Sequence, residues 1–91
     1  MQHPGISADA AANDALIARY DLERQLRLAR RHYEDACAAA CQARDEWRAL
    51  STHPRARAAD VAAVREKFRA VAARCNRLRA VIEALEDRLD V

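Results

Sequence analysis

The chain has 91 residues and a formal net charge of +2. That length permits one small domain, and that charge is too small to indicate a polyanionic partner. The 52% hydrophobic fraction overstates the core, because 23 residues are alanine, which favours helix but brings little area to bury. One glycine and two prolines leave few breaks between elements, so the composition excludes a fold of many strands.

Residues 1–6 contain a His-Pro-Gly sequence and are expected to form a flexible leader. Residues 7–91 are expected to form a single domain, whose first helix begins near Ser7, a suitable N-cap, and ends at about residue 50. Along this helix, residues of one seam recur in alternating steps of four and three, and only Arg19 among them is polar. The seam comprises Ala15, Arg19, Leu22, Leu26, Ala29, Tyr33, Ala36, Ala40, Ala43, Trp47 and Leu50.

A turn at about residues 51–53 should separate this helix from a second one at about 54–90, because proline suits the first turn of a helix. The second helix repeats the same spacing without a polar residue. Its seam comprises Val61, Val64, Phe68, Val71, Cys75, Leu78, Ile82, Leu85 and Leu89. Alternating steps of three and four are the a/d pattern by which one helix lies along another.

A short turn between two long helices makes them antiparallel neighbours, and the seams align when Leu50 lies beside Val61 and Leu22 beside Leu89. In this register residues 65–79, net +5, lie beside residues 32–46, net −3. Residues 80–91, net −3, lie beside residues 19–31, net +3. We therefore predict an all-α fold, an antiparallel two-helix coiled-coil hairpin, and expect it to dimerise into a four-helix bundle.

The larger seam residues are expected to form the core. They are Leu22, Leu26, Tyr33, Trp47, Leu50, Val61, Val64, Phe68, Val71, Leu78, Ile82, Leu85 and Leu89. Phe68 is the one aromatic residue of the second helix, so its truncation is predicted to be the costliest there.

The first helix is longer than the second, so residues 7–19 should extend past the end of their partner. Leu16 and Ile17 lie in this extension, with Tyr20 at its base, and the sequence does not place them on one face. Exposed apolar residues of this kind indicate association, so we expect Leu16, Ile17 and Tyr20 to bind a partner, either a second copy of the chain or another protein.

No residue set indicates catalysis, a cofactor or a metal. Cys37 and Cys41 are one helical turn apart, but a closed zinc site needs four ligands, and His32 and Cys75 do not complete one. The three cysteines cannot all pair within the chain, which favours a reducing compartment. The sequence also lacks a signal peptide and an apolar run of membrane-spanning length, so a cytoplasmic location is expected.

A basic flank on the second helix supports an alternative function, RNA binding by a small dimeric helical hairpin. It comprises Arg65, Arg69, Arg74, Arg77 and Arg79. The acidic block of the first helix balances these charges, and no aromatic platform for stacking bases accompanies them, so nucleic acid is the less favoured partner.

Trp47 lies directly before the turn, followed by Arg48 and Ala49. In this position, in length and in hairpin layout the chain resembles the WXG100 family of secreted helical hairpins, which carry Trp-x-Gly there. Ala49 stands in place of the glycine, and the family's aromatic–acidic export signal is missing after Leu85. The resemblance implies a secreted hairpin as a second alternative.

The function that the sequence favours is non-enzymatic. We expect a bacterial protein–protein interaction module, such as an adaptor, an assembly factor or a secretion-chaperone-like hairpin, acting by helix–helix docking without a small-molecule substrate.

Overall fold

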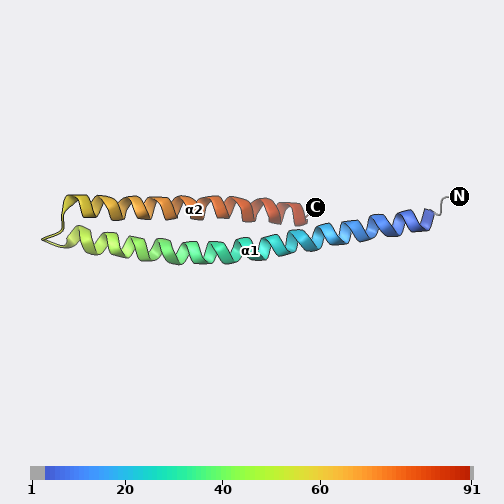
Figure 1. Ribbon diagram of the computed structural model, residues 1–91, viewed down its shortest axis with the longest axis horizontal. Helices are drawn as coiled ribbons and strands as arrows, with labels where there is room; N and C mark the ends of the chain where they lie inside the picture. Colours follow the sequence, from blue (N-terminus) through green and yellow to red (C-terminus); the bar gives the residue numbers. More distant parts are fainter. Residues whose placement is uncertain (1–3, 91) are drawn as a thin grey trace.

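The computed structural model describes residues 4–90, and the side chains of residues 9–90. Two helices, α1 (Pro4–Thr52) and α2 (Ala58–Asp90), account for 94% of the described residues. They run antiparallel and form a rod 83 Å long (Figure 1). This confirms the predicted all-α helical hairpin. The 49 residues of α1 span about 73 Å and the 33 residues of α2 about 50 Å, so α1 extends past the C-terminal end of its partner.

The helices are long because their interiors contain neither proline nor glycine beyond the first turn of α1, while alanine is frequent. Side chains one turn apart add local support on the exposed surface. Arg19 pairs with Glu23 at 3.3 Å, and Arg24 pairs with Asp21 at 3.2 Å. Each such pair contributes only a few tenths of a kcal/mol, about 0.2–0.5, so packing of the two helices must supply most of the stability.

The N-terminal boundary of α1 differs from the prediction. The helix begins at Pro4, so Pro4 to Ile6 belong to it, and Ser7 lies inside rather than capping it. Proline fits the first helical position because its missing N–H would have no partner there. Residues 1–3 of the predicted leader lie outside the described residues.

The predicted turn boundaries were also wrong by a few residues. α1 continues to Thr52, and the turn occupies residues 53–57, so α2 begins at Ala58 rather than at Pro54. The Ala56 N–H donates to the His53 carbonyl at 3.2 Å, which closes a β-turn with Pro54 as its second residue. Proline is favoured both at the second position of a β-turn and in the first turn of a helix. Here Pro54 takes the β-turn position, because the chain must reverse direction between the two helices.

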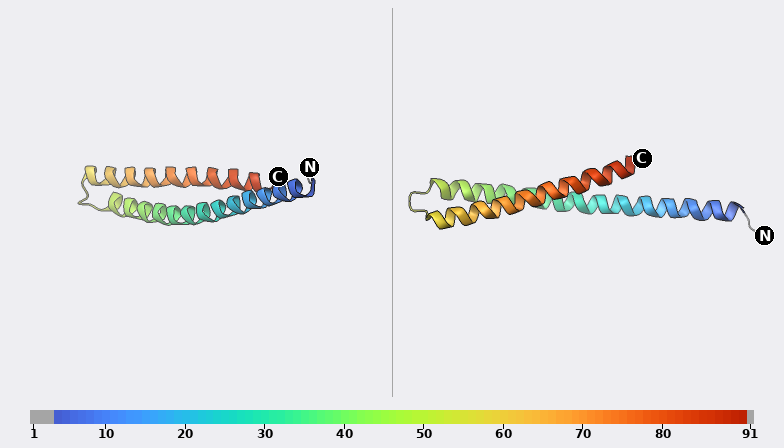
Figure 2. Two further views of the ribbon diagram at one scale, coloured as in Figure 1. Left: turned by 45° about the vertical axis from the view of Figure 1, so that its right-hand side comes forward. Right: turned by 90° about the horizontal axis from the view of Figure 1, so that it is seen from above.

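Burial follows the predicted seams closely. Every seam position from Leu22 to Leu50 and from Val61 to Leu89 is buried or half-buried. The most deeply buried side chains are Leu26, Ala29, Ala36, Ala43, Cys75 and Leu85, each at most 8% exposed. Ala15 and Arg19 are exposed because α2 ends before it can cover them. In the two views of Figure 2, α2 runs along α1 and crosses it, as two helices of a coiled coil do.

The contacts between the helices agree with the predicted register. Leu26 and Leu85, which the register pairs, share one buried cluster with Ala29. Ion pairs join the opposite charge blocks in both halves of the hairpin. Arg30 Nη2 lies 3.7 Å from Glu86 Oε2, and Lys67 Nζ lies 3.4 Å from Glu46 Oε2.

Near the turn, two aromatic side chains that the register does not pair, Trp47 and Phe68, are in contact. The register places Phe68 beside Ala43 and Trp47 beside Val64, but the rings of Phe68 and Trp47 also meet, with centroids 5.7 Å apart and planes tilted by 32°. Both side chains are half-buried. A large side chain contacts residues one turn away on the partner helix as well as the residue directly opposite, so a register of single pairs does not include all of its contacts.

Because Leu85 is more deeply buried than Phe68, we now expect truncation of Leu85, rather than of Phe68, to reduce stability most in α2. We expect Leu85→Ala to reduce the free energy of unfolding by about 2–4 kcal/mol, since it leaves a void against Leu26. Phe68→Ala should cost less, because the Phe68 side chain is only partly buried whereas Leu85 is 6% exposed.

Chemical denaturation followed by circular dichroism measures both changes. Val81→Ala is the matched control: Val81 is 48% exposed, and its truncation should change stability by no more than about 0.5 kcal/mol. A Leu85→Ala variant as stable as the control would contradict the seam packing.

Candidate partner-binding surface

The C-terminal end of α2 fixes where α1 loses its partner. The Arg19 guanidinium donates from Nη1 to the Leu89 carbonyl at 3.3 Å, close to the last residue of α2. We call residues 4–20 of α1 the overhang. The described residues of α2 end beside Arg19, and all side chains from residue 9 to residue 20 are exposed.

The overhang carries the most exposed apolar side chains of the described chain. Leu16 and Ile17 are each 66% exposed, and Tyr20 is 63% exposed. Only two further large apolar residues with described side chains are exposed, Leu28 at 44% and Val81 at 48%, and both lie where the helices are paired. Exposed apolar surface is therefore concentrated at one end of the rod.

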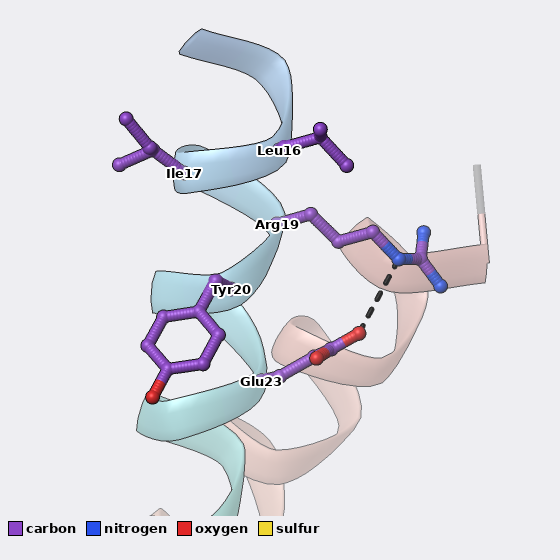
Figure 3. Close-up of a pocket in the computed structure, with 5 residues that line it drawn as sticks. All are labelled: Leu16, Ile17, Arg19, Tyr20 and Glu23. Atoms are coloured by element: carbon purple, nitrogen blue, oxygen red, sulfur yellow. Dashed lines mark ion pairs between the residues drawn. The ribbon is translucent and has the colours of Figure 1, made fainter. Parts of the chain in front are cut away.

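These three side chains border one shallow hollow, which Arg19 and Glu23 complete. Figure 3 shows Ile17 and Tyr20 on one side of the helix and Leu16, Arg19 and Glu23 on the other, with Arg19 extending toward the end of α2. The sequence did not place the three apolar residues on one face. At about 100° per residue they span an arc of roughly 100°, with Leu16 and Ile17 at its two edges and Tyr20 between them, so they border the same depression.

The charges at the hollow are paired with each other. The Arg19 Nε lies 3.3 Å from Glu23 Oε1, as the dashed line in Figure 3 marks. Both side chains are more than 40% exposed, so this pair contributes little stability. Its position matters more, because it covers the edge of the hollow nearest α2 and leaves the apolar side chains facing outward.

The predicted basic flank does not form one surface. At about 100° per residue, Arg65, Arg69 and Arg79 share one side of α2, whereas Arg74 and Arg77 point roughly 120–180° away from Arg65. All five are exposed. Arg65 and Arg69 both approach Glu66, at 4.0 and 3.3 Å.

Arg79 is engaged with the other helix. It donates from Nη2 to the Tyr33 hydroxyl at 3.1 Å, and its guanidinium carbon lies 5.9 Å from the centre of the Tyr33 ring. The hydrogen bond from Arg79 to Tyr33 raises the pKa of the guanidinium above its ordinary value. A phosphate ligand would have to compete with this contact, which weighs against the flank as a row of phosphate-binding arginines.

A second hollow, near the turn, was not identified from the sequence. It is lined by Arg44, Trp47, Arg48, Ser51, Thr52 and Phe68. Trp47 and Phe68 provide apolar surface, and Arg44 and Arg48 provide positive charge, so the hollow suits a ligand with an apolar part and an anionic part. The sequence signal for this hollow is the pair of arginines three residues before and one residue after Trp47, but the seam pattern places Trp47 wholly in the core.

The cysteines differ in environment. Cys41 is exposed, Cys37 is half-buried and Cys75 is buried, and all three are free thiols. Burial raises the pKa of the Cys75 thiol, and a hydrogen bond with the Cys37 side chain raises it further. Cys75 is therefore the thiol held within the seam, whereas Cys41 lies outside it.

Within the described residues, no group of three or more His, Cys, Asp or Glu side chains is arranged to hold a metal ion. In the same part of the chain, neither helix carries an apolar stretch long enough for a bilayer crossing.

The fold and this surface define a helical hairpin with one uncovered helix end. No family model matches the chain, and neither a curated protein nor a solved structure matches it. The likeness to WXG100 hairpins therefore stays a prediction that depends on the position of Trp47.

We expect thiol reactivity to follow the three environments. With a thiol reagent under native conditions, Cys41 should react first and Cys75 last, at least about tenfold more slowly, because the thiolate is the reactive form and burial disfavours it. Peptide mass spectrometry after timed quenching identifies each site. Equal rates for Cys41 and Cys75 in the folded chain would show that Cys75 is not held in the seam.

Proposed function

We propose that this chain is a non-enzymatic protein–protein interaction module, which binds a helix of its partner along the overhang. The observation that carries the proposal is the concentration of exposed apolar side chains at Leu16, Ile17 and Tyr20. These residues border one hollow on a helix that has no neighbour there. An adaptor, an assembly factor and a chaperone-like hairpin would all use such a surface.

The mode of binding is the docking of one apolar helix stripe against another. A helix is the suitable ligand because the overhang is itself a helix, with an open hollow rather than a deep pocket. The spacing of Leu16 and Tyr20 is one helical turn, which matches side chains that repeat every three or four residues on a partner.

The apolar side chains supply part of the free energy that a reversible contact needs. Fully burying a large aliphatic or aromatic side chain contributes about 1.5–3 kcal/mol. Three such side chains offset part of the entropy lost on association, for which estimates run to about 4–15 kcal/mol. Binding therefore also needs the partner's own apolar residues.

The paired part of the hairpin provides much less apolar surface. Leu28 and Val81 are its exposed large apolar residues among the described side chains, and charged residues occupy much of the remaining flanks. Packing of two whole hairpins side by side into a four-helix bundle would bury many of these charges, which costs free energy unless each is paired. The overhang is the better-supported surface.

The test replaces both aliphatic residues of the overhang by aspartate. The variant carrying Leu16→Asp and Ile17→Asp should lose partner binding at least tenfold, equivalent to about 1.4 kcal/mol, while its unfolding midpoint stays near that of the parent. Affinity capture from the native host, followed by titration of the captured protein, measures the loss.

Val81→Asp is the matched control, since it introduces the same charge at an exposed apolar residue outside the overhang. It should bind like the parent. If the overhang variant binds as tightly as the parent and the control does not, the partner docks on the paired part of the hairpin and the proposed surface is wrong.

A further inference from the structure

If the overhang binds a helix, as proposed above, the charges beside its apolar residues indicate which helix that is. We propose that the overhang docks against the overhang of a second copy of this chain, with the two α1 helices antiparallel and a two-fold axis near residue 18.

One stripe of α1 carries the argument. At about 100° per residue, seven residues fall within an arc of roughly 100° that contains the apolar side chains of the hollow. In order they are Asp9, Asn13, Leu16, Ile17, Tyr20, Arg24 and Arg27. The stripe is acidic at its N-terminal end, apolar in the middle and basic at its C-terminal end.

That order makes the stripe complementary to itself in one orientation. Asp9 and Arg27 are each nine residues, or about 13 Å, from residue 18. Antiparallel docking centred there places Asp9 opposite the second copy's Arg27, and the symmetry creates the same pair twice. Parallel docking would instead place Asp9 beside Asp9 and Arg27 beside Arg27, which is unfavourable.

The two charged residues are available for this contact. No ion pair within the described part of the chain uses Asp9 or Arg27. By contrast, Arg24 already pairs with Asp21, and Arg19 pairs with Glu23. Among the charged residues of the stripe, the two without an ion pair in the described chain are the ones that the antiparallel arrangement brings together.

The same arrangement completes the apolar centre. Leu16 and Ile17 face the second copy's Tyr20, and Tyr20 faces the second copy's Leu16 and Ile17. Six side chains that are each more than 60% exposed in the single chain would then cover one another. The Asp9–Arg27 pairs would flank this cluster on both sides, as the polar rim of an interface does.

The second helix of the hairpin does not obstruct the approach. At about 100° per residue, the centre of the stripe points roughly 160° around α1 from the seam that α2 covers. A second copy can therefore lie along α1 from Pro4 to about residue 32, a stretch of about 43 Å. This overlap is longer than the overhang itself, so it adds contacts on the exposed side of the paired region.

Sedimentation equilibrium of the full chain tests the proposal, with loading concentrations from about 1 µM to 1 mM in low salt. We expect a monomer–dimer equilibrium. Asp9→Arg alone and Arg27→Asp alone should each weaken it about three- to tenfold, since each reverses two exposed ion pairs. The double variant should restore the parent's dissociation constant within about twofold, because the charges again face their opposites.

The double variant is the decisive measurement, because it keeps both substitutions but recovers the pairing only in the antiparallel arrangement. A double variant as weak as the single ones would overturn that arrangement. Leu16→Asp with Ile17→Asp should weaken the dimer at least tenfold, whereas Val81→Asp should leave it unchanged. Circular dichroism confirms that each variant retains the parent's helix content.

A parent chain that remains monomeric at 1 mM would overturn self-docking but not the proposed function. In that case capture of a different protein that depends on Leu16 and Ile17 would assign the overhang to that partner. Loss of self-association in the apolar variant, together with rescue in the charge-swapped one, would establish the second copy as the occupant.

Discussion

The interaction on which the whole structure depends is the close approach of α2 to a row of alanines on α1. Ala29, Ala36 and Ala43 are at most 7% exposed, because the larger side chains of α2 lie over them. Small residues on one helix opposite large residues on the other allow the seam to close without deep cavities. This fit sets the register, and the register in turn decides which charges meet and how far α1 extends beyond its partner.

Sequence periodicity predicted the hairpin and its register because each seam is long and almost free of errors. A shift by one heptad would bury the same kinds of residue, but it would also misalign the charge blocks that Arg30–Glu86 and Lys67–Glu46 now join. The boundaries were less predictable. Pro54 suits both a helix's first turn and a β-turn, and local preference alone cannot choose between them when the chain must also reverse direction.

The candidate surface was predictable in position but not in shape. Counting residues beyond the end of α2 located Leu16 and Ile17, since that count needs only the register. That they border one hollow depends on Tyr20 and the extended Arg19 side chain, which no periodicity describes. The basic flank shows the same limit: its arginines are close in sequence, but Arg74 and Arg65 point to different sides of α2.

The uncovered end of α1 also affects how the chain orders itself. The paired region supplies a stable helical nucleus, so the overhang forms by adding residues to an existing helix and avoids the cost of nucleation. Without packing, each added residue gains only its intrinsic helix propensity, and helicity decreases toward the terminus. A molecule that covers the stripe would supply the packing that this part of α1 lacks, so its binding would also stabilise the helix on which it docks.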